Sequence, residues 1–351
     1  MSLVSRLCLL LAVLVLSACG KEPAVYQEQS YVFGTLVDVS IYGEDEARAR
    51  QAAGMVMREF QRLHDMLHAW QPSELSELNA ALADGKSKKI TPELAVMLQD
   101  AARLSAQSGG LFNPAIGGLI EVWGFHADEF KPVRPDAAKI AAYVQADPQM
   151  SDLVFSLGAQ GGEMMVSSGN PAVRLDLGGY AKGYALDRAA LLLRQQGIHH
   201  ALINIGGNIL ALGRHDKRPW RVGIQHPRKS GALALLELHD GEAIGTSGDY
   251  QRYFELDGKR YCHLIDPRSG YPTHGVQAVT ILTRGPQAGV LSDAASKPLF
   301  VAGAAGWRAA AGRMQLPEVL LVDGQGGIHL TAALQKRLEF ADKDIKMEVL
   351  P

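Results

Sequence analysis

Apolar residues recur at helical spacing in several stretches of the chain. Between residues 47 and 67 this spacing predicts an amphipathic helix whose apolar face belongs to the core. Thr91 followed by Pro92 predicts the start of a second helix, which should end at Ser108 because two glycines follow it. Three further stretches favour helices: residues 136–144, 181–196 and 292–314.

Shorter apolar runs between these helices predict strands. The first covers Val32 to Ile41 and is interrupted by Gly34 and Thr35. From residue 173 the chain shows a strand, a glycine turn, a helix and a second strand, an order typical of an α/β unit. The strands predicted in this part are residues 173–177, 201–205, 220–225, 233–238, 276–282 and 318–322.

The first twenty residues predict where the protein resides. Arg6 precedes an apolar run over residues 7–16 that is too short to span a bilayer, so residues 1–18 are predicted to be a signal peptide. The sequence Leu-Ser-Ala-Cys-Gly at its end has the pattern of a bacterial lipobox, in which Cys19 carries a lipid such as palmitate. An ordinary secretory signal with an incidental cysteine is the alternative. Residues 19–30 are then a lipidated tether, and residues 31–351 form a domain that faces the periplasm from the membrane of the bacterial cell envelope.

Composition adds two exclusions. Of the three cysteines, only Cys262 belongs to the predicted folded domain, so no intramolecular disulfide is possible there, and we interpret it as a packing residue. The formal net charge of -2 provides no basic surface for nucleic acid, which we do not expect as a partner. The hydrophobic content of 47% is sufficient for a large core, in one lobe or two.

Two glycine turns are candidates for phosphate binding. In the first, Asp176 ends a strand, Gly179 lies in the turn, and Lys182 lies just inside the next helix, where N–H groups and the helix dipole attract anions. The second turn, in residues 204–208, follows the next strand and could present further amides beside the first. Purely structural turns have the same appearance in a sequence, so both interpretations stay open.

Two further side chains are suited to catalysis. His263 is the best candidate for a general base, because an imidazole near its ordinary pKa accepts a proton at neutral pH; a structural histidine is the alternative. Asp293, at the start of the helix predicted over 292–314, is the most plausible ligand for a hard cation such as Mg²⁺. An N-cap of that helix is the alternative interpretation of Asp293.

The motifs, taken in order, resemble those of a known family. They are Phe33-Gly34-Thr35, Trp70, Leu111-Phe112-Asn113-Pro114 with Trp123-Gly124-Phe125, LDLGGYAKGYA from Leu175, NIGGN from Asn204, TSGDYQRYF from Thr246, HLIDPRSGYP from His263 and SDAASKPL from Ser292. Their order and spacing over about residues 31–322 resemble the FAD:protein FMN transferase (ApbE) family, which consists of lipid-anchored bacterial enzymes.

The resemblance implies a fold, a reaction and partners. We expect an α+β, ApbE-like fold of mixed sheets and packed helices, with an FAD cleft between two lobes. The implied reaction transfers FMN from FAD to a threonine of a target flavoprotein, with AMP leaving and Mg²⁺ polarising the diphosphate. The implied partners are FAD and periplasm-facing flavoprotein subunits that carry a Ser/Thr acceptor motif.

The resemblance also assigns roles to single residues. It implies that Trp70 stacks on the flavin ring and that His263 accepts the proton of the attacking threonine. Contacts with FAD are implied for Phe33, Trp70, Leu111, Phe112, Asn113, Asp176, Lys182 and Ile265. The positions implied for the magnesium site are Gly179, Asp293, Ser296 and Lys297.

Two positions depart from the family pattern. Asn113 stands where the family usually has aspartate, and Lys297 where its metal segment usually has threonine. Together they shift the local charge by about two positive units, which disfavours a divalent cation nearby, and Lys297 can instead contact phosphate itself. Three hypotheses follow: an active transferase with a modified metal site, an FAD-binding family member with weak or no transferase activity, and an FAD diphosphate hydrolase that uses water.

Overall fold

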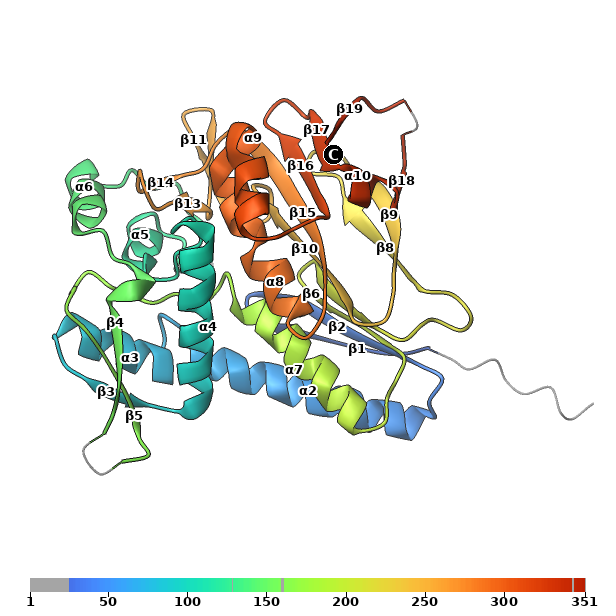
Figure 1. Ribbon diagram of the computed structural model, residues 1–351, viewed down its shortest axis with the longest axis horizontal. Helices are drawn as coiled ribbons and strands as arrows, with labels where there is room; N and C mark the ends of the chain where they lie inside the picture. The colour runs from blue at the N-terminus through green and yellow to red at the C-terminus, as the bar shows by residue number, and fades with distance from the viewer. Residues whose placement is uncertain (1–24, 128, 159–160, 343, 351) are drawn as a thin grey trace, which may run out of the picture.

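The computed structural model describes residues 25–127, 129–158, 161–342 and 344–350, and it shows a mixed α+β fold (Figure 1). The predicted signal peptide and the predicted lipid site, Cys19, lie outside these residues. Strand β1, Val25–Val32, begins inside the segment predicted as a tether, so the folded domain starts before Tyr31. Within the described part of the chain, no helix has the length and apolar character needed to cross a membrane.

A large central sheet organises the fold. In the described residues it has nine strands, in the order β1-β2-β6-β7-β10-β15-β16-β17-β19. Neighbours are antiparallel except β17 and β19, which run parallel. The bounds are Val25–Val32, Thr35–Tyr42, Ala201–Ile205, Asn208–Leu212, Glu242–Gly248, Val276–Arg284, Val319–Asp323, Ile328–Thr331 and Met347–Leu350, in the same order.

Different layers cover the two faces of this sheet. Helices lie on one face (Figure 1): α2 (Glu46–Leu67), α7 (Ala181–Gln195), α8 (Ala288–Ala294) and α9 (Ser296–Arg313). A three-stranded sheet packs on the other: β8 (Trp220–Gln225), β9 (Ala232–Leu238) and β18 (Leu338–Phe340), with the short helix α10 (Ala332–Gln335) beside it. In β15, Val279 belongs to the apolar cluster that includes α9, whereas Ala278 belongs to the cluster beneath the small sheet. This alternation follows from the two-residue period of a strand, and covering both faces explains why β15 is buried along almost its whole length.

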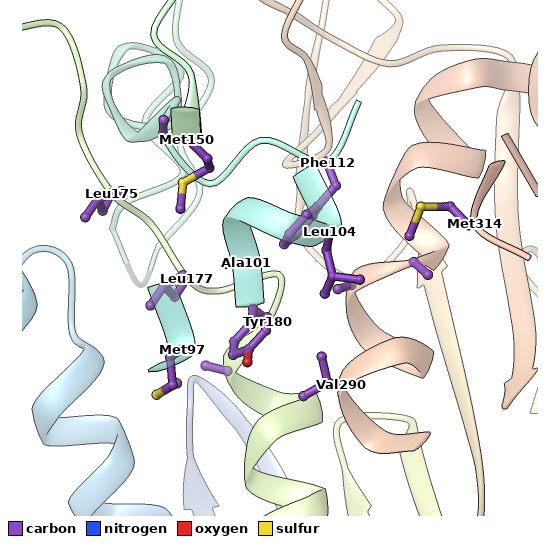
Figure 2. Packing of buried hydrophobic residues seen from close by; sticks show 14 of the residues in the cluster. Met97, Ala101, Leu104, Phe112, Met150, Leu175, Leu177, Tyr180, Val290 and Met314 are labelled. Atoms are coloured by element: carbon purple, nitrogen blue, oxygen red, sulfur yellow. The ribbon is translucent and has the colours of Figure 1, made fainter. Parts of the chain in front are cut away.

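A second lobe lies beside the central sheet, at the left of Figure 1. Its elements are α3 (Glu74–Ala83), β3 (Lys88–Ile90), α4 (Pro92–Ser108), α5 (Gly117–Val122), α6 (Ala137–Ala146), a 3-10 turn (Met150–Asp152), β4 (Leu153–Leu157) and β5 (Met164–Ser168). Two hairpins complete the fold: β11 (Tyr253–Leu256) with β12 (Lys259–Cys262), and β13 (Ile265–Asp266) with β14 (Tyr271–Pro272). The apolar core is continuous between the lobes, because Leu104 of α4 shares a cluster with Tyr180 before α7 and Val290 of α8 (Figure 2).

The predicted helices are observed with one change. The structure confirms the helices that correspond to α2, α4, α6 and α7, and Thr91 caps α4 by accepting the N–H of Leu94 at 3.3 Å. The helix predicted over 292–314 is instead two helices, α8 and α9, which meet at Ala295.

Two strand predictions need correction. Residues 173–177 form no strand, because the backbone N–H groups of Arg174 and Asp176 donate to the carbonyls of Ala115 and Pro114 in a loop instead of joining a sheet. The single strand predicted over residues 32–41 is the hairpin of β1 and β2, which turns at Phe33 and Gly34.

Tight hairpin turns bring two segments of the predicted site together. Phe33 and Gly34 have φ of 56° and 68°, and Gly206 and Gly207, between β6 and β7, have φ of 57° and 90°. Such positive values are typical of two-residue hairpin turns and favour glycine. A Cβ atom at Gly206 would lie 2.6 Å from Thr35 Oγ1, so the two turns are in close contact.

Helices α7 and α8 touch through their backbones. A Cβ atom at Gly183 would lie 2.4 Å from the Gly289 carbonyl oxygen, and one at Gly289 would lie 2.4 Å from the Gly183 carbonyl oxygen. The helices also cap each other. Asp187 of α7 accepts the N–H groups of Gly289 and Val290 at 2.8 and 2.9 Å, and Asp293 of α8 accepts the N–H of Gly183 at 3.0 Å. These N–H groups lie in first helical turns, where no partner exists within the same helix.

This contact predicts the effect of adding one methyl group. Gly183→Ala should lower the free energy of unfolding by about 1–3 kcal/mol, because backbone atoms of α8 must move to accommodate the methyl group. Gly312→Ala is the matched control, since glycine 312 lies in α9 with nothing within 4 Å of its Cβ position, and alanine there should stabilise by up to about 1 kcal/mol. Urea unfolding followed by circular dichroism measures both changes. Equal stability of Gly183→Ala and the wild type would contradict the close contact.

Candidate functional site

A cavity of about 670 Å³ lies where the central sheet meets the second lobe. The turns at residues 33–35 and 204–209 and the end of β10 line it from the sheet, and residues 111–125 line it from the second lobe. Its size is within the usual range for small-molecule sites. One wall is apolar and aromatic: Leu111, Phe112, Ile116, Ile120 and Phe125. Charged side chains gather near the first glycine turn, the charged end of the cavity: Asp176, Lys182, Asp293 and Lys297, with Phe112 beside them at 3.6 Å from the Cβ position of Gly179.

Most of the predicted site residues meet in this cavity, although they are far apart in the sequence. The lining includes Phe33, Leu111, Phe112, Asn113, Asp176, Gly179, Lys182, His263, Ile265, Asp293 and Lys297. Of the remaining predicted site residues in the described part of the chain, Trp70 and Ser296 do not line it. Both glycine turns also contribute, as the sequence suggested they could.

Trp70 lies away from the cavity. The guanidinium carbon of Arg174 is 4.3 Å from the centroid of its ring, and the ring of His126 is 5.4 Å away. The indole is half-buried against the core of the second lobe. Stacking on a flavin therefore stays a prediction for Trp70, and the aromatic rings that face the cavity are Phe33, Phe112, Phe125 and Tyr250.

Asp293 lies at the end of α8, not at the start of a helix as the sequence suggested. The interpretation as N-cap of its own helix is wrong, because the carboxylate caps the first turn of α7 through the N–H of Gly183. Ser296 connects the Asp293 backbone to β10. Its hydroxyl donates to the Asp293 carbonyl oxygen at 2.8 Å and lies 2.7 Å from the hydroxyl of Ser247 on β10.

Two lysines neutralise the buried Asp293. The ammonium group of Lys297 forms an ion pair with Asp293 Oδ1 and donates to the Asp293 carbonyl oxygen at 2.7 Å, while Lys182 Nζ lies 3.6 Å from Oδ1. Burial alone would raise the pKa of Asp293, but the two ammonium groups and the Gly183 N–H hold it at about 2. Burial lowers the pKa of Lys297 to about 8, against the attraction of Asp293. At neutral pH Lys182, Lys297 and Asp293 together carry one positive charge, which the Asp176 carboxylate at the same end of the cavity balances.

The residues of this cluster do not fit a magnesium ion held by the protein. Mg²⁺ requires oxygen ligands, yet Asp293 already gives Oδ1 to Lys297 and Oδ2 to Gly183. The Cε atom of Lys297 lies 3.3 Å from the Cβ position of Gly179, so the lysine fills the space between the two implied ligands, Gly179 and Asp293. In the described residues, no three His, Cys, Asp or Glu side chains gather as candidate metal ligands. A cation of the protein itself occupies the predicted magnesium position.

The first glycine turn is held rigidly at the charged end. Asp176 Oδ1 accepts the N–H of Gly178 at 2.7 Å, and Lys182 Nζ donates to the Gly178 carbonyl oxygen at 3.2 Å. Asp176 thus stabilises the turn, and Lys182 bridges it to Asp293. This arrangement places the start of α7 and two ammonium groups at one end of the cavity, which suits an anionic ligand.

His263 faces the cavity as a neutral imidazole. Burial, the positive charge of Arg252 and that of Lys182 lower its pKa to about 3, which corrects the expectation of an ordinary pKa. Its Nδ1 lies 3.2 Å from the Arg252 carbonyl oxygen. If Nδ1 carries the hydrogen and donates it there, Nε2 is left as the proton acceptor.

Asn113 has a structural function that an aspartate could not perform. Its amide nitrogen donates to the Pro148 carbonyl oxygen at 2.8 Å, and its amide oxygen accepts the N–H of Ala115 at 3.0 Å. The side chain is buried, so each of these groups needs its partner. The departure from the family pattern at this position is therefore matched by the surrounding backbone.

Sequence reasoning missed several residues of the cavity. Tyr250 and Arg252 lie in the motif TSGDYQRYF, but the sequence predicts no role for either side chain. Gln225 on β8 gives no sequence signal, because strand pairing brings it to the cavity. Cys262 is buried and burial raises its pKa to about 12, in agreement with a packing role.

Known proteins are similar to this chain over most of its length. The model of the ApbE family matches residues 33–321. An FAD:protein FMN transferase of Rhodobacter capsulatus is 44% identical over 89% of this chain, which spans only 58% of that relative's length. An FAD:protein FMN transferase of Klebsiella pneumoniae (strain 342) is 33% identical to this chain. The match covers 79% of this chain and 81% of the length of that relative.

Two solved structures have the same fold. The ApbE protein of Thermotoga maritima superposes with a TM-score of 0.79 at 27% identity, covering 90% of this chain and 99% of its own. The flavinyl transferase ApbE of Pseudomonas stutzeri superposes with a TM-score of 0.75 at 28% identity, covering 90% of this chain and 98% of its own. These likenesses agree with the predicted α+β, ApbE-like fold.

The contacts of Asn113 predict the effect of the aspartate usual at this position. Asn113→Asp should cost about 1–3 kcal/mol of stability at pH 7, because a carboxylate would face the Pro148 carbonyl oxygen without a hydrogen to donate. Protonation restores a donor, so the difference from the wild type should shrink as the pH falls toward about 4. Urea unfolding of both proteins across this pH range measures the difference. A difference that grows at low pH would contradict the assigned hydrogen bond.

Proposed function

The chain belongs to the ApbE family, and on this premise we propose that it is an FAD:protein FMN transferase. The observation that carries the proposal is one cavity that is lined both by aromatic and apolar side chains and by glycine turns with two ammonium groups. A flavin ring suits the first and a diphosphate suits the second. The two relatives from Rhodobacter capsulatus and Klebsiella pneumoniae, both FAD:protein FMN transferases, support the same assignment.

The proposed step transfers the FMN phosphoryl group to a threonine of the acceptor protein. The threonine oxygen attacks the phosphorus on the FMN side of the diphosphate, and a new P–O bond forms. The bond from this phosphorus to the bridging oxygen breaks, and AMP leaves with that oxygen and the electron pair. Lys182 and Lys297 lie at the end of the cavity where this negative charge develops, so they stabilise it. No step is assigned to Mg²⁺, because the residues do not fit it.

His263 is the proposed acceptor of the threonine proton. The ring lines the cavity, and a neutral imidazole is the form that can take up a proton. Its low pKa belongs to the free protein. A diphosphate brought next to it adds negative charge, which favours the imidazolium and raises the pKa during the reaction. The proton then passes to solvent.

The proposed acceptor is a periplasm-facing flavoprotein subunit with a Ser/Thr motif, and the proposed anchor is a lipid on Cys19 in the bacterial cell envelope. The support for both is the amino-terminal sequence and the family resemblance. The described residues begin at Val25, close behind the proposed lipid site, so β1 would lie near the membrane surface.

The test is a transfer assay with the full-length chain in mild detergent, FAD and a purified acceptor subunit. We expect covalently bound FMN, seen as flavin fluorescence of the denatured acceptor, and an equal amount of AMP. His263→Gln should slow labelling about 100- to 10,000-fold while FAD binding persists, because the variant loses the proton acceptor.

Two other outcomes would replace the proposal. Bound FAD with neither AMP nor labelled acceptor would show an FAD-binding protein without transfer. AMP and free FMN without a labelled acceptor would show an FAD diphosphate hydrolase in which water takes the place of threonine.

A further inference from the structure

The ion pair of Lys297 and Asp293 lies at the charged end of the cavity. Both residues line the cavity, but Asp293 is fully buried and the side chain of Lys297 is 14% exposed, so the lysine is the more accessible of the two. An anion at the first glycine turn would meet the ammonium group first, because the side chain of Lys297 passes next to Gly179. The Asp293 carboxylate and its carbonyl oxygen hold the lysine in place.

The ammonium group has one donor left for a ligand. A lysine has three N–H donors, and in the described part of the chain Lys297 gives two of them to Asp293, one to the carboxylate and one to the carbonyl oxygen. The hydroxyl of Ser296 donates to the same carbonyl oxygen. The lysine is therefore held before any ligand binds, and it loses little conformational freedom when its third N–H binds a phosphate oxygen.

The charge of the cluster suits a diphosphate without an added metal ion. Lys182 and Lys297 balance the carboxylates of Asp293 and Asp176, so this end of the cavity needs no added cation to offset its own negative charges. A divalent cation placed here would lie close to both ammonium groups, and this repulsion would weaken its binding. The same two ammonium groups attract the anion that a metal ion would otherwise neutralise.

We propose that Lys297 is a built-in cation that binds the diphosphate of FAD in place of a protein-bound magnesium ion. The proposal rests on the proposed function, since FAD is the ligand considered. It assigns binding and charge stabilisation to Lys297, positioning of the lysine to Asp293, and a second phosphate contact to Lys182. FAD binding by this chain is then independent of divalent cations.

The test measures FAD affinity of the full-length chain by titration calorimetry, once with EDTA and once with excess MgCl₂. We expect equal dissociation constants within about twofold for the wild type. Lys297→Gln keeps two N–H donors for Asp293 but loses the charge, and it should bind FAD about 10- to 100-fold more weakly in EDTA. Lys86→Gln is the matched control, since that lysine is exposed and pairs with Asp84 outside the cavity, and its affinity should not change.

Lys297→Thr tests the exchange of lysine for metal directly. It removes the ammonium group beside Asp293, so its FAD affinity should fall in EDTA and recover with Mg²⁺. Its melting temperature should also rise with Mg²⁺, because the ion pairs with the exposed carboxylate. Thermal melts with and without Mg²⁺ show whether each variant is folded. The comparison of wild-type FAD affinity in EDTA and in MgCl₂ does not depend on any variant.

Several results would overturn the inference. A wild-type affinity that falls more than about tenfold in EDTA would show that a metal ion is needed, and unchanged binding by folded Lys297→Gln would show that the lysine is not a ligand. Metal-independent FAD binding without FMN transfer would remove the proposed function and leave the inference standing. Absence of FAD binding under both conditions would remove both.

Discussion

The mutual capping of helices α7 and α8 determines the geometry of the site. Each helix supplies an aspartate to the first turn of the other, and glycines at the crossing let the backbones touch. With a larger residue at Gly183, Asp293 could not reach the N–H of α7. The carboxylate would then lose its position beside Lys182, and Lys297 would lose its anchor. The helix crossing thus places Lys182 of α7 and Asp293 of α8, and Asp293 in turn holds Lys297 of α9.

The rest of the cavity follows from how other elements meet this crossing. The first glycine turn leads directly into α7, so it lies beside the lysines. The hairpin turns at Phe33 and Gly206 come from the central sheet, and the second lobe adds the aromatic wall. The cavity therefore combines aromatic and apolar side chains with ammonium groups and backbone turns, as a ligand with a flat ring and a diphosphate requires. His263 stays neutral between them because the nearby positive charges of Arg252 and Lys182 add to the effect of burial.

Part of the fold could be predicted from the sequence, because it depends on residues that are close together in the chain. Apolar residues recur at helical spacing within α2, α4 and α7. The N-cap at Thr91 depends only on residues that are adjacent in the sequence. The capping of α7 by Asp293 could not be predicted in this way, because Asp293 and Gly183 are 110 positions apart in the sequence. The same holds for residues 173–177, whose backbone partners lie in a distant loop, and for Trp70, whose ring is covered by Arg174. The family resemblance gathered most of the cavity residues, but it implied a metal where this chain has an ammonium group.

The most direct test of this account is a crystal structure of the chain with FAD, grown with MnCl₂ and measured at the manganese absorption edge. Manganese is a close substitute for magnesium and gives an anomalous signal. The account predicts Lys297 Nζ within hydrogen-bonding distance of a diphosphate oxygen, still paired with Asp293, and no anomalous peak between them. An anomalous peak at Asp293 with the lysine displaced would contradict it.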